Sequence, residues 1–180
     1  MKRLSCLFAP ALPALALLTA CSGAADQPTG NSAATAQPAL LPLAIRTAKG
    51  VHRFQVEMAR TPAEQEKGLM FRKTLGADSG MLFPMAPPRT ASFWMENTVI
   101  PLDMLFIRTD GTIAFIGANE APYSRIPVSA GIPVAAVLEL RGGRAAELGI
   151  AEGDRVQWGA CAAPDKKSAV DLNFCPTDAP

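Results

Sequence analysis

Apolar residues occur along the chain in short runs, several of which alternate with polar residues in the manner of β-strands. The clearest alternation lies at 52–58, where Phe54, Val56 and Met58 are separated by polar neighbours. Similar runs predict further strands at 45–47, 80–83, 92–95, 102–108, 112–116, 134–140 and 155–158. The sequence Thr109-Asp110-Gly111 joins two of these runs and predicts a β-hairpin.

Signals for helices are few and short. Thr61 and Glu64 have the spacing of a capping box, and Pro62 stands at the first helical position, so we expect a short helix that ends near 68–72. Residues 143–148 predict about one helical turn closed by Gly149. The pattern predicts an α+β domain that is mainly antiparallel β, a small barrel or sandwich with one or two short helices.

The N-terminal residues have the layout of a secretory signal. Lys2 and Arg3 precede an uncharged apolar run at 7–20. A membrane-spanning helix needs about 20 apolar residues, and this run is shorter and is interrupted by Pro10 and Pro13. We therefore expect a cleaved signal peptide over residues 1–20.

The run ends in Leu18-Thr19-Ala20-Cys21, which resembles the lipobox of bacterial lipoproteins. The resemblance implies that Cys21 receives diacylglycerol and becomes the mature N-terminus. More than one acyl chain gives stable anchoring, so the membrane is an expected partner. Ser22 after the cysteine implies, by the same resemblance, the outer membrane if the host is Gram-negative. We expect a lipid-anchored protein on the periplasmic face of the cell envelope.

The mature chain divides into three parts. Residues 21–42 are small, polar and proline-containing, which predicts a flexible tether. Residues 43–159 form the domain, and 160–180 form a C-terminal tail. Cys161 and Cys175 lie in this tail and are expected to form a structural disulfide. A metal or redox pair is the weaker alternative, because the spacing is not CxxC and no histidine lies nearby.

The charge balance argues against nucleic acid as a partner. The signal holds two of the 17 basic residues and none of the 16 acidic ones, which leaves a formal net charge of −1. A nucleic-acid-binding protein would need a basic patch. No cofactor is expected either.

Several sequence blocks occur in a specific order, namely 56–61, 68–72, 80–83, 93–98, 100–103, 106–107, 137–140, Gly143, 148–150 and Gly153-Asp154. Together, from about residue 44 to 158, they resemble the DUF192 family (UPF0127). The resemblance implies a compact, mainly β domain of bacteria and archaea that is often exported. It implies no particular reaction.

The block at 93–103 is the densest in polar and aromatic residues. Asn97 and Thr98 have the chemistry of turn-capping residues. Alternatively, Asn97 and Asp103 face a polar ligand and Trp94 stacks on it. Arg72 is either a solvated cation at a helix end, a partner of Asp103 or a residue that binds a carboxylate. We expect these five residues to form a ligand-binding pocket.

Evidence for catalysis is weak. Glu57, Asp103 and Glu139 are candidates for an acid–base pair, but their spacing in the sequence does not indicate one. Glu57 alternates with the apolar residues of its strand, which predicts that it is exposed. There is no G-x-S-x-G sequence, and the one histidine, His52, lies at a strand start. No set of zinc ligands is evident, so we assign neither a catalytic residue nor a metal site.

The leading hypothesis is therefore an envelope-anchored, non-catalytic binding or interaction domain for an unknown small polar ligand or envelope partner. One alternative is a carboxylate-dependent hydrolase acting on envelope glycan. Another is a periplasmic Cu(I)-binding protein, because thioethers bind Cu(I). Methionines also fill gaps in cores, and the domain contains six: Met58, Met70, Met81, Met85, Met95 and Met104.

Overall fold

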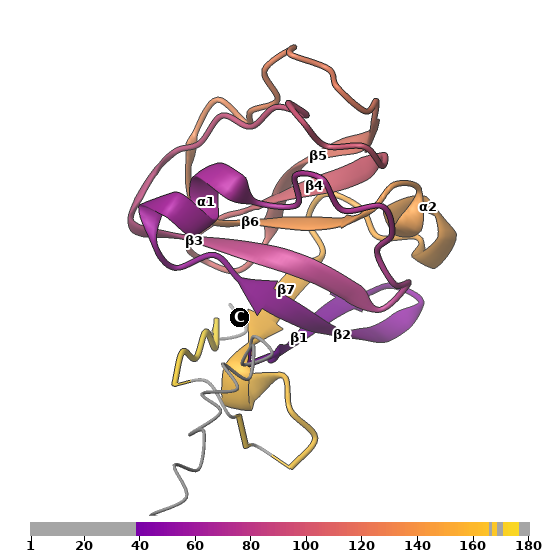
Figure 1. Cartoon of the computed structure of the whole chain (residues 1–180). Helices are drawn as coiled ribbons and strands as arrows, with labels where there is room; N and C mark the ends of the chain where they lie inside the picture. The colour runs from indigo at the N-terminus through magenta and orange to yellow at the C-terminus, as the bar shows by residue number, and fades with distance from the viewer. Residues whose placement is uncertain (1–38, 166, 169–170, 177–180) are drawn as a thin grey trace, which may run out of the picture. The chain divides into compact units, whose positions relative to one another are not determined.

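The computed structural model describes residues 39–165, 167–168 and 171–176 (Figure 1). The expected signal peptide, the acylated Cys21 and most of the tether lie outside the described residues. None of the helices within the described ranges has the length and hydrophobicity needed to cross a membrane.

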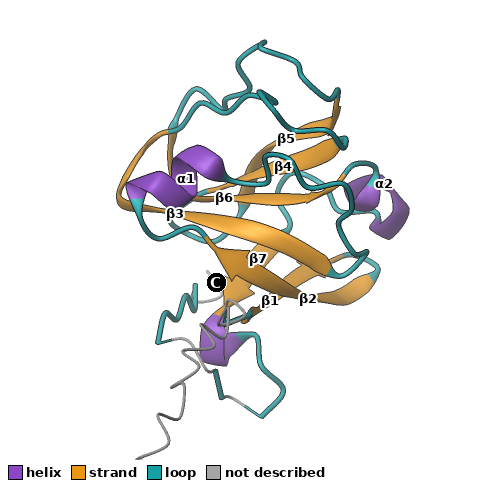
Figure 2. Ribbon diagram, in the orientation of Figure 1, coloured by secondary structure: helices purple, strands orange, loops and turns teal. Residues whose placement is uncertain are grey.

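The described residues form a seven-stranded sheet with the order β5-β4-β6-β3-β2-β1-β7 (Figure 2). All neighbouring strands are antiparallel except β2 and β3, which are parallel. The strands are β1 (Leu41–Thr47), β2 (Gly50–Met58), β3 (Ser79–Thr90), β4 (Leu102–Ile107), β5 (Ile113–Glu120), β6 (Pro133–Arg141) and β7 (Arg155–Trp158). The helices are α1 (Pro62–Lys67), α2 (Arg144–Leu148) and the 3₁₀ helix η1 (Gly159–Cys161).

The expected α+β class with a mainly antiparallel sheet and short helices is confirmed. The sheet is not closed into a barrel. Its two edge strands nevertheless approach each other, because Thr112 forms an isolated bridge with Arg155 and the Ile113 amide donates to the Asp154 carbonyl.

Both faces of the sheet are buried, which explains why its central strands are apolar without alternation. On one face Leu82, Leu105 and Leu138 belong to a core cluster that also includes residues of β1, β2, β7 and α2. On the other face Phe83 and Phe106 belong to a second cluster with Leu69 and part of the segment 91–98. This second face carries the candidate site.

The local sequence signals are confirmed. The Thr61 hydroxyl accepts from the Glu64 amide at 3.2 Å, while the Glu64 carboxylate accepts from the Thr61 amide at 2.8 Å. β4 and β5 pair as a hairpin around 109–111. Gly149 ends α2 in the left-handed conformation with φ of 68°.

Several strand predictions differ from the structure. β3 continues to Thr90 and β5 to Glu120, beyond the expected ends at 83 and 116. β1 begins at Leu41, which is fully buried, rather than at Ile45. The strand expected at 92–95 is wrong: Phe93 forms one isolated bridge with Val128, and the neighbouring residues form no ladder. Aromatic residues raised the apparent strand propensity there, but the segment instead crosses the second face as a covering loop.

The expected disulfide between Cys161 and Cys175 is present, with their Cα atoms 5.6 Å apart. The tail is further held against the edge strand, because the Phe174 ring stacks on Trp158 with centroids 4.1 Å apart. The two residues also form a β-bridge. The disulfide thus closes a loop that already contacts the core.

Candidate functional site

A cavity of about 390 Å³ lies on the second face of the sheet, within the range of small-molecule sites. Its walls come from α1 and the three residues after it, from β3, from the segment 91–98 and from β6. The lining residues are Gln65, Glu66, Lys67, Gly68, Leu69, Met70, Phe83, Met85, Arg89, Ala91, Ser92, Phe93, Trp94, Glu96, Thr98 and Glu139.

The first wall is α1, which is fixed to the sheet by Gln65. The Gln65 side-chain amide donates to the carbonyls of Ala59 at 3.3 Å and Pro84 at 3.1 Å. Its oxygen accepts from the Arg89 guanidinium at 3.3 Å. Because the helix has only six residues, these side-chain bonds and the capping box hold it in place.

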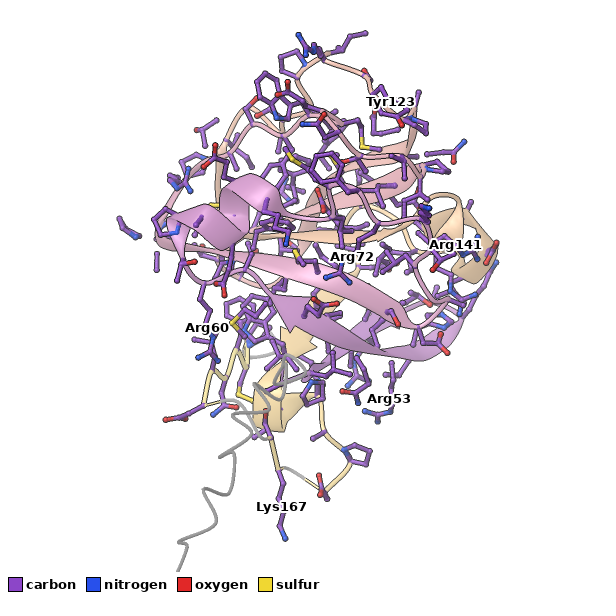
Figure 3. The ribbon with its side chains drawn as sticks, in the orientation of Figure 1. Arg53, Arg60, Arg72, Tyr123, Arg141 and Lys167 are labelled. Carbon is purple, nitrogen blue, oxygen red and sulfur yellow. A yellow bond between two sulfur atoms is a disulfide. The ribbon has the colours of Figure 1, made fainter. Side chains whose placement is uncertain are left out.

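The opposite wall is the segment 91–98, which backbone hydrogen bonds hold on both sides. The Phe71 amide donates to the Asn97 carbonyl at 2.9 Å, and the Tyr123 amide donates to the Thr98 carbonyl at 3.1 Å. Phe71, Asn97 and Tyr123 all have positive φ, between 54° and 63°. This conformation is rare for aromatic residues and costs of order 1–3 kcal/mol each. Phe71 and Tyr123 are both exposed, and Figure 3 labels Tyr123.

Glu139 on β6 is the acidic residue of the cavity that is most buried, with 5% of its surface exposed. It lies opposite Met81 of β3 and Met104 of β4, so both of its neighbours across the sheet are methionines. Among the residues that the structure describes, none donates a hydrogen bond to its carboxyl group. Burial raises the pKa of Glu139 from 4.5 to about 8, so the group is mostly protonated at neutral pH.

A second carboxylate lies on the same face of the sheet. Glu57 of β2 is in register with Met81, which in turn is in register with Glu139. Two strand spacings therefore separate the backbones of Glu57 and Glu139, about 10 Å. The side chain of Glu57 is 20% exposed and forms two hydrogen bonds with the Arg72 guanidinium, so the expectation that it points into solvent is wrong. The same bonds raise the pKa of Arg72.

Of the five residues expected to form a pocket, the structure brings Trp94 and Thr98 to the cavity. Trp94 is 52% exposed at the rim, whereas Thr98 is buried. Asn97 has the left-handed conformation of a turn residue, and its side-chain amide contacts the Met70 sulfur at 3.8 Å. Arg72 pairs with Glu57 rather than with Asp103.

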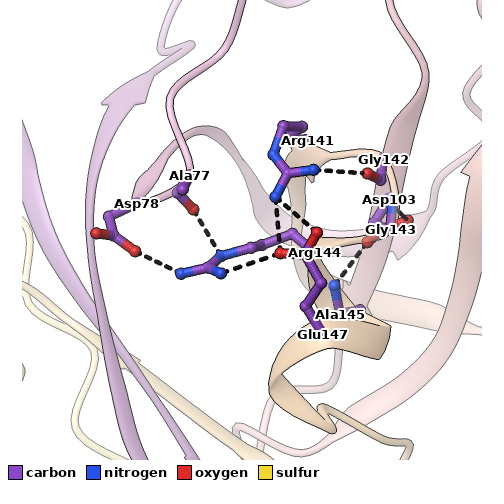
Figure 4. A network of polar contacts seen from close by, with 9 residues as sticks. All are labelled: Ala77, Asp78, Asp103, Arg141, Gly142, Gly143, Arg144, Ala145 and Glu147. Carbon is purple, nitrogen blue, oxygen red and sulfur yellow. Dashed lines mark hydrogen bonds and ion pairs between the residues drawn. The ribbon is translucent and has the colours of Figure 1, made fainter.

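Asp103 lies apart from these residues, on the other face of the sheet. It is in register with Leu140, whereas its neighbour Met104 is in register with Glu139. One carboxylate oxygen accepts from the amides of Asn119 at 2.7 Å and Gly143 at 2.9 Å, and the other accepts from Ala145 at 2.7 Å. Figure 4 draws Asp103 with Gly143 and Ala145. The side chain thus caps the start of α2, where helix amides lack partners.

Sequence reasoning missed the residues that surround the cavity entrance, namely Glu66, Lys67, Arg89 and Glu96. The sequence pattern alone did not distinguish Glu139 from the other acidic candidates, Glu57 and Asp103. A signal was available: Glu139 is the one ionisable residue within the apolar run at 134–140, and such a position in a central strand predicts burial.

The structure gives limited support to a metal-binding site, including the Cu(I) site considered from the sequence. Within the described part of the chain, no three His, Cys, Asp or Glu residues are grouped so that they could hold a metal ion. Two thioethers, of Met70 and Met85, line the cavity. Met81, Met95 and Met104 are buried in the adjacent core cluster, as packing methionines would be.

The chain belongs to the DUF192 family, described as "Uncharacterized ACR", whose model matches residues 44–158. A comparison with curated proteins finds no match.

Two solved structures are similar to the chain. A protein of unknown function from Novosphingobium aromaticivorans DSM 12444 is 50% identical, with a TM-score of 0.65 over 66% of this chain and 85% of that one. A protein from Sinorhizobium meliloti 1021, described as a proposed transcription regulator, is 41% identical. Its TM-score is 0.65, over 68% of this chain and 96% of that one.

Proposed function

We propose that the protein is a small-ligand-binding domain, held at the periplasmic face of the bacterial envelope by a lipid on Cys21. The ligand occupies the cavity between α1 and the segment 91–98. The observation that carries this proposal is the Glu139 carboxyl group, buried at the cavity without a hydrogen-bond donor among the described residues. Because the Glu139 side chain is largely buried but opens to the cavity, a ligand in the cavity can supply the missing hydrogen-bond donor.

The two walls also support a binding role. α1 and the segment 91–98 are fixed by side-chain and backbone hydrogen bonds, so the cavity is formed before a ligand arrives. A preformed site avoids the cost of ordering loops on binding. The exposed indole of Trp94 at the rim offers a flat apolar surface on which a ligand can stack.

The lipid anchor rests on the sequence of the N-terminal region. The charged start, the short apolar run and the lipobox-like residues before Cys21 all agree with export and acylation. The disulfide between Cys161 and Cys175 is consistent with an oxidising compartment. Binding to nucleic acid has no comparable support, because such proteins are usually basic and the formal net charge of this chain is near zero.

Retention of small molecules tests the proposal. The purified domain is immobilised and exposed to a polar extract of bacterial envelopes, and retained compounds are measured by mass spectrometry. We expect at least one compound to be retained by the wild type and lost when Ser92→Trp fills the cavity entrance. An exposed acid far from the cavity, changed in Glu152→Gln, should leave retention intact. Equal retention by all three proteins, or by none, contradicts the proposal.

Hydrolysis of envelope glycan is the second candidate function. It is favoured by one observation: Glu139 holds its proton at neutral pH, as a general acid must, and shares its cavity with the carboxylates of Glu66 and Glu96. Release of soluble fragments from purified peptidoglycan would be abolished in Glu139→Gln. If the wild type releases none, binding without catalysis stands.

A further inference from the structure

The surroundings of Glu139 restrict what can partner it. The aromatic rings of Phe83 and Phe93 line the same cavity and contact each other edge to face, with centroids 5.0 Å apart. The Met85 thioether also lines it. Aromatic faces attract cations, and thioethers are polarisable. None of these groups supplies a positive charge for an anion, and the carboxyl group would repel an anion once it is ionised.

The charged groups that face the cavity lie toward its exposed side. α1 contributes Glu66 and Lys67, β3 contributes Arg89, and the segment 91–98 contributes Glu96. Glu96 is paired with Arg125 at 3.0 Å, outside the lining. β4 faces Glu139 with Met104, which is uncharged. Glu139 is therefore the buried ionisable residue of the inner wall. The two acidic and two basic residues toward the exposed side give that part of the cavity a net charge near zero.

A carboxyl group at this position has one property that glutamine lacks, which is the ability to become negative. A neutral ligand that needed only a hydrogen-bond donor would be served equally by an amide, without the cost of burying an acid. A cation, in contrast, compensates the buried charge directly.

We propose that the cavity binds a small organic ammonium ion, whose charged nitrogen pairs with the Glu139 carboxylate while its alkyl part contacts Phe83 and Phe93. This inference rests on the proposed binding function and names the class of ligand. The ligand keeps its proton, because alkylammonium groups resemble the lysine side chain with a pKa of about 10.4. Glu139 releases its proton to solvent as the pair forms.

The proton balance gives the test a definite sign. With a pKa of about 8, Glu139 is about 90% protonated at pH 7 and about 10% protonated at pH 9. Binding of an ammonium ion should therefore release about one proton at pH 7 and few at pH 9. The apparent affinity should rise about tenfold between these two pH values. A neutral ligand that accepts a hydrogen bond from the protonated acid would instead bind about tenfold more weakly at pH 9.

The probe is n-hexylamine, and 1-hexanol is its neutral counterpart. Titration calorimetry in two buffers of different ionisation enthalpy gives both the affinity and the number of protons released. We expect the wild type to bind hexylamine with the stated pH dependence and to bind 1-hexanol much more weakly. Glu139→Gln keeps the size of the side chain and should abolish hexylamine binding. Glu152→Gln changes an exposed acid that does not line the cavity, and this variant should retain binding.

The outcomes separate the two proposals. If hexylamine does not bind, or binds with falling affinity toward pH 9, the ammonium inference is overturned. The binding function still stands in that case if the envelope extract yields a retained compound that Ser92→Trp loses. If hexylamine binds the wild type and Glu139→Gln equally, the amine occupies another surface and the inference fails.

Discussion

Asp103 and Glu139 lie on neighbouring strands of the sheet with their side chains on opposite faces. Asp103 is opposite Leu140, and Glu139 is opposite Met104. Three backbone amides donate to Asp103, whereas no described residue donates to the Glu139 carboxyl group. Of two acids in similar apolar runs, one completes a structural network and the other faces a cavity.

Asp103→Asn should destabilise the fold by about 2–4 kcal/mol, because hydrogen bonds to charged groups contribute about 1.5–3 kcal/mol and the new amide faces an unpaired N–H. Chemical denaturation measures the loss. Asp78→Asn is the matched control: this carboxylate pairs with Arg144 but is 71% exposed, so its loss should stay below about 1 kcal/mol. Similar small losses for both variants would argue against the capping role.

Glu139→Gln should change the dependence of stability on pH. Below about pH 4.5 the acid is protonated in both the folded and the unfolded chain. Between about pH 4.5 and 8 only the unfolded chain releases the proton, so the wild type loses roughly 1.4 kcal/mol per pH unit relative to Glu139→Gln. Thermal melts from pH 5 to 9 check this expectation. Parallel stability curves for the two proteins would mean that Glu139 is not protonated in the fold.

Glu66→Gln provides the control for that experiment. Its side chain lies at the cavity entrance and is exposed, so its stability curve should follow that of the wild type.

The pairing of Arg72 with Glu57 predicts coupled losses of stability. Arg72→Met and Glu57→Gln should each cost about 1–2 kcal/mol, and the double variant should cost less than their sum by about 1 kcal/mol. Arg72→Met and Asp103→Asn, in contrast, should add, because the two side chains share no partner and lie on different faces of the sheet. Coupling between Arg72 and Asp103 would contradict the structure.

Cys21→Ser tests the proposed lipid anchor. The wild type should be recovered with membranes, because two or three acyl chains give stable attachment. The variant should be released or should accumulate as uncut precursor. Immunoblots of cell fractions show where the protein is and whether the precursor is cut. Labelling with a radioactive fatty acid shows whether it is acylated. Soluble wild-type protein with an N-terminus elsewhere would end this proposal.

Local features of the fold were predictable from the sequence because they depend on neighbouring residues. The capping box of Thr61 and Glu64, the hairpin at 109–111 and the role of Gly149 are such features. The disulfide was predictable by elimination among few cysteines.

The candidate site was less predictable because it depends on strand register. The sequence places Asp103 and Glu139 in apolar runs, but the face that each occupies follows from the pairing of β4 with β6. A shift by one residue would exchange their faces. The partner of Arg72 likewise depends on the return of the chain after α1 to the end of β2.

β7 is a four-residue strand at the edge of the sheet, and contacts along its outer side leave little of it open. The Val156 amide donates to the Gly111 carbonyl, and Trp158 exchanges backbone hydrogen bonds with Phe174. Open edge strands are templates for pairing between copies. A protein gathered by a lipid on a two-dimensional surface would meet its own copies far more often than one diffusing freely. The covered edge would keep such crowded copies separate without help from electrostatic repulsion, which a chain of near-zero net charge cannot supply.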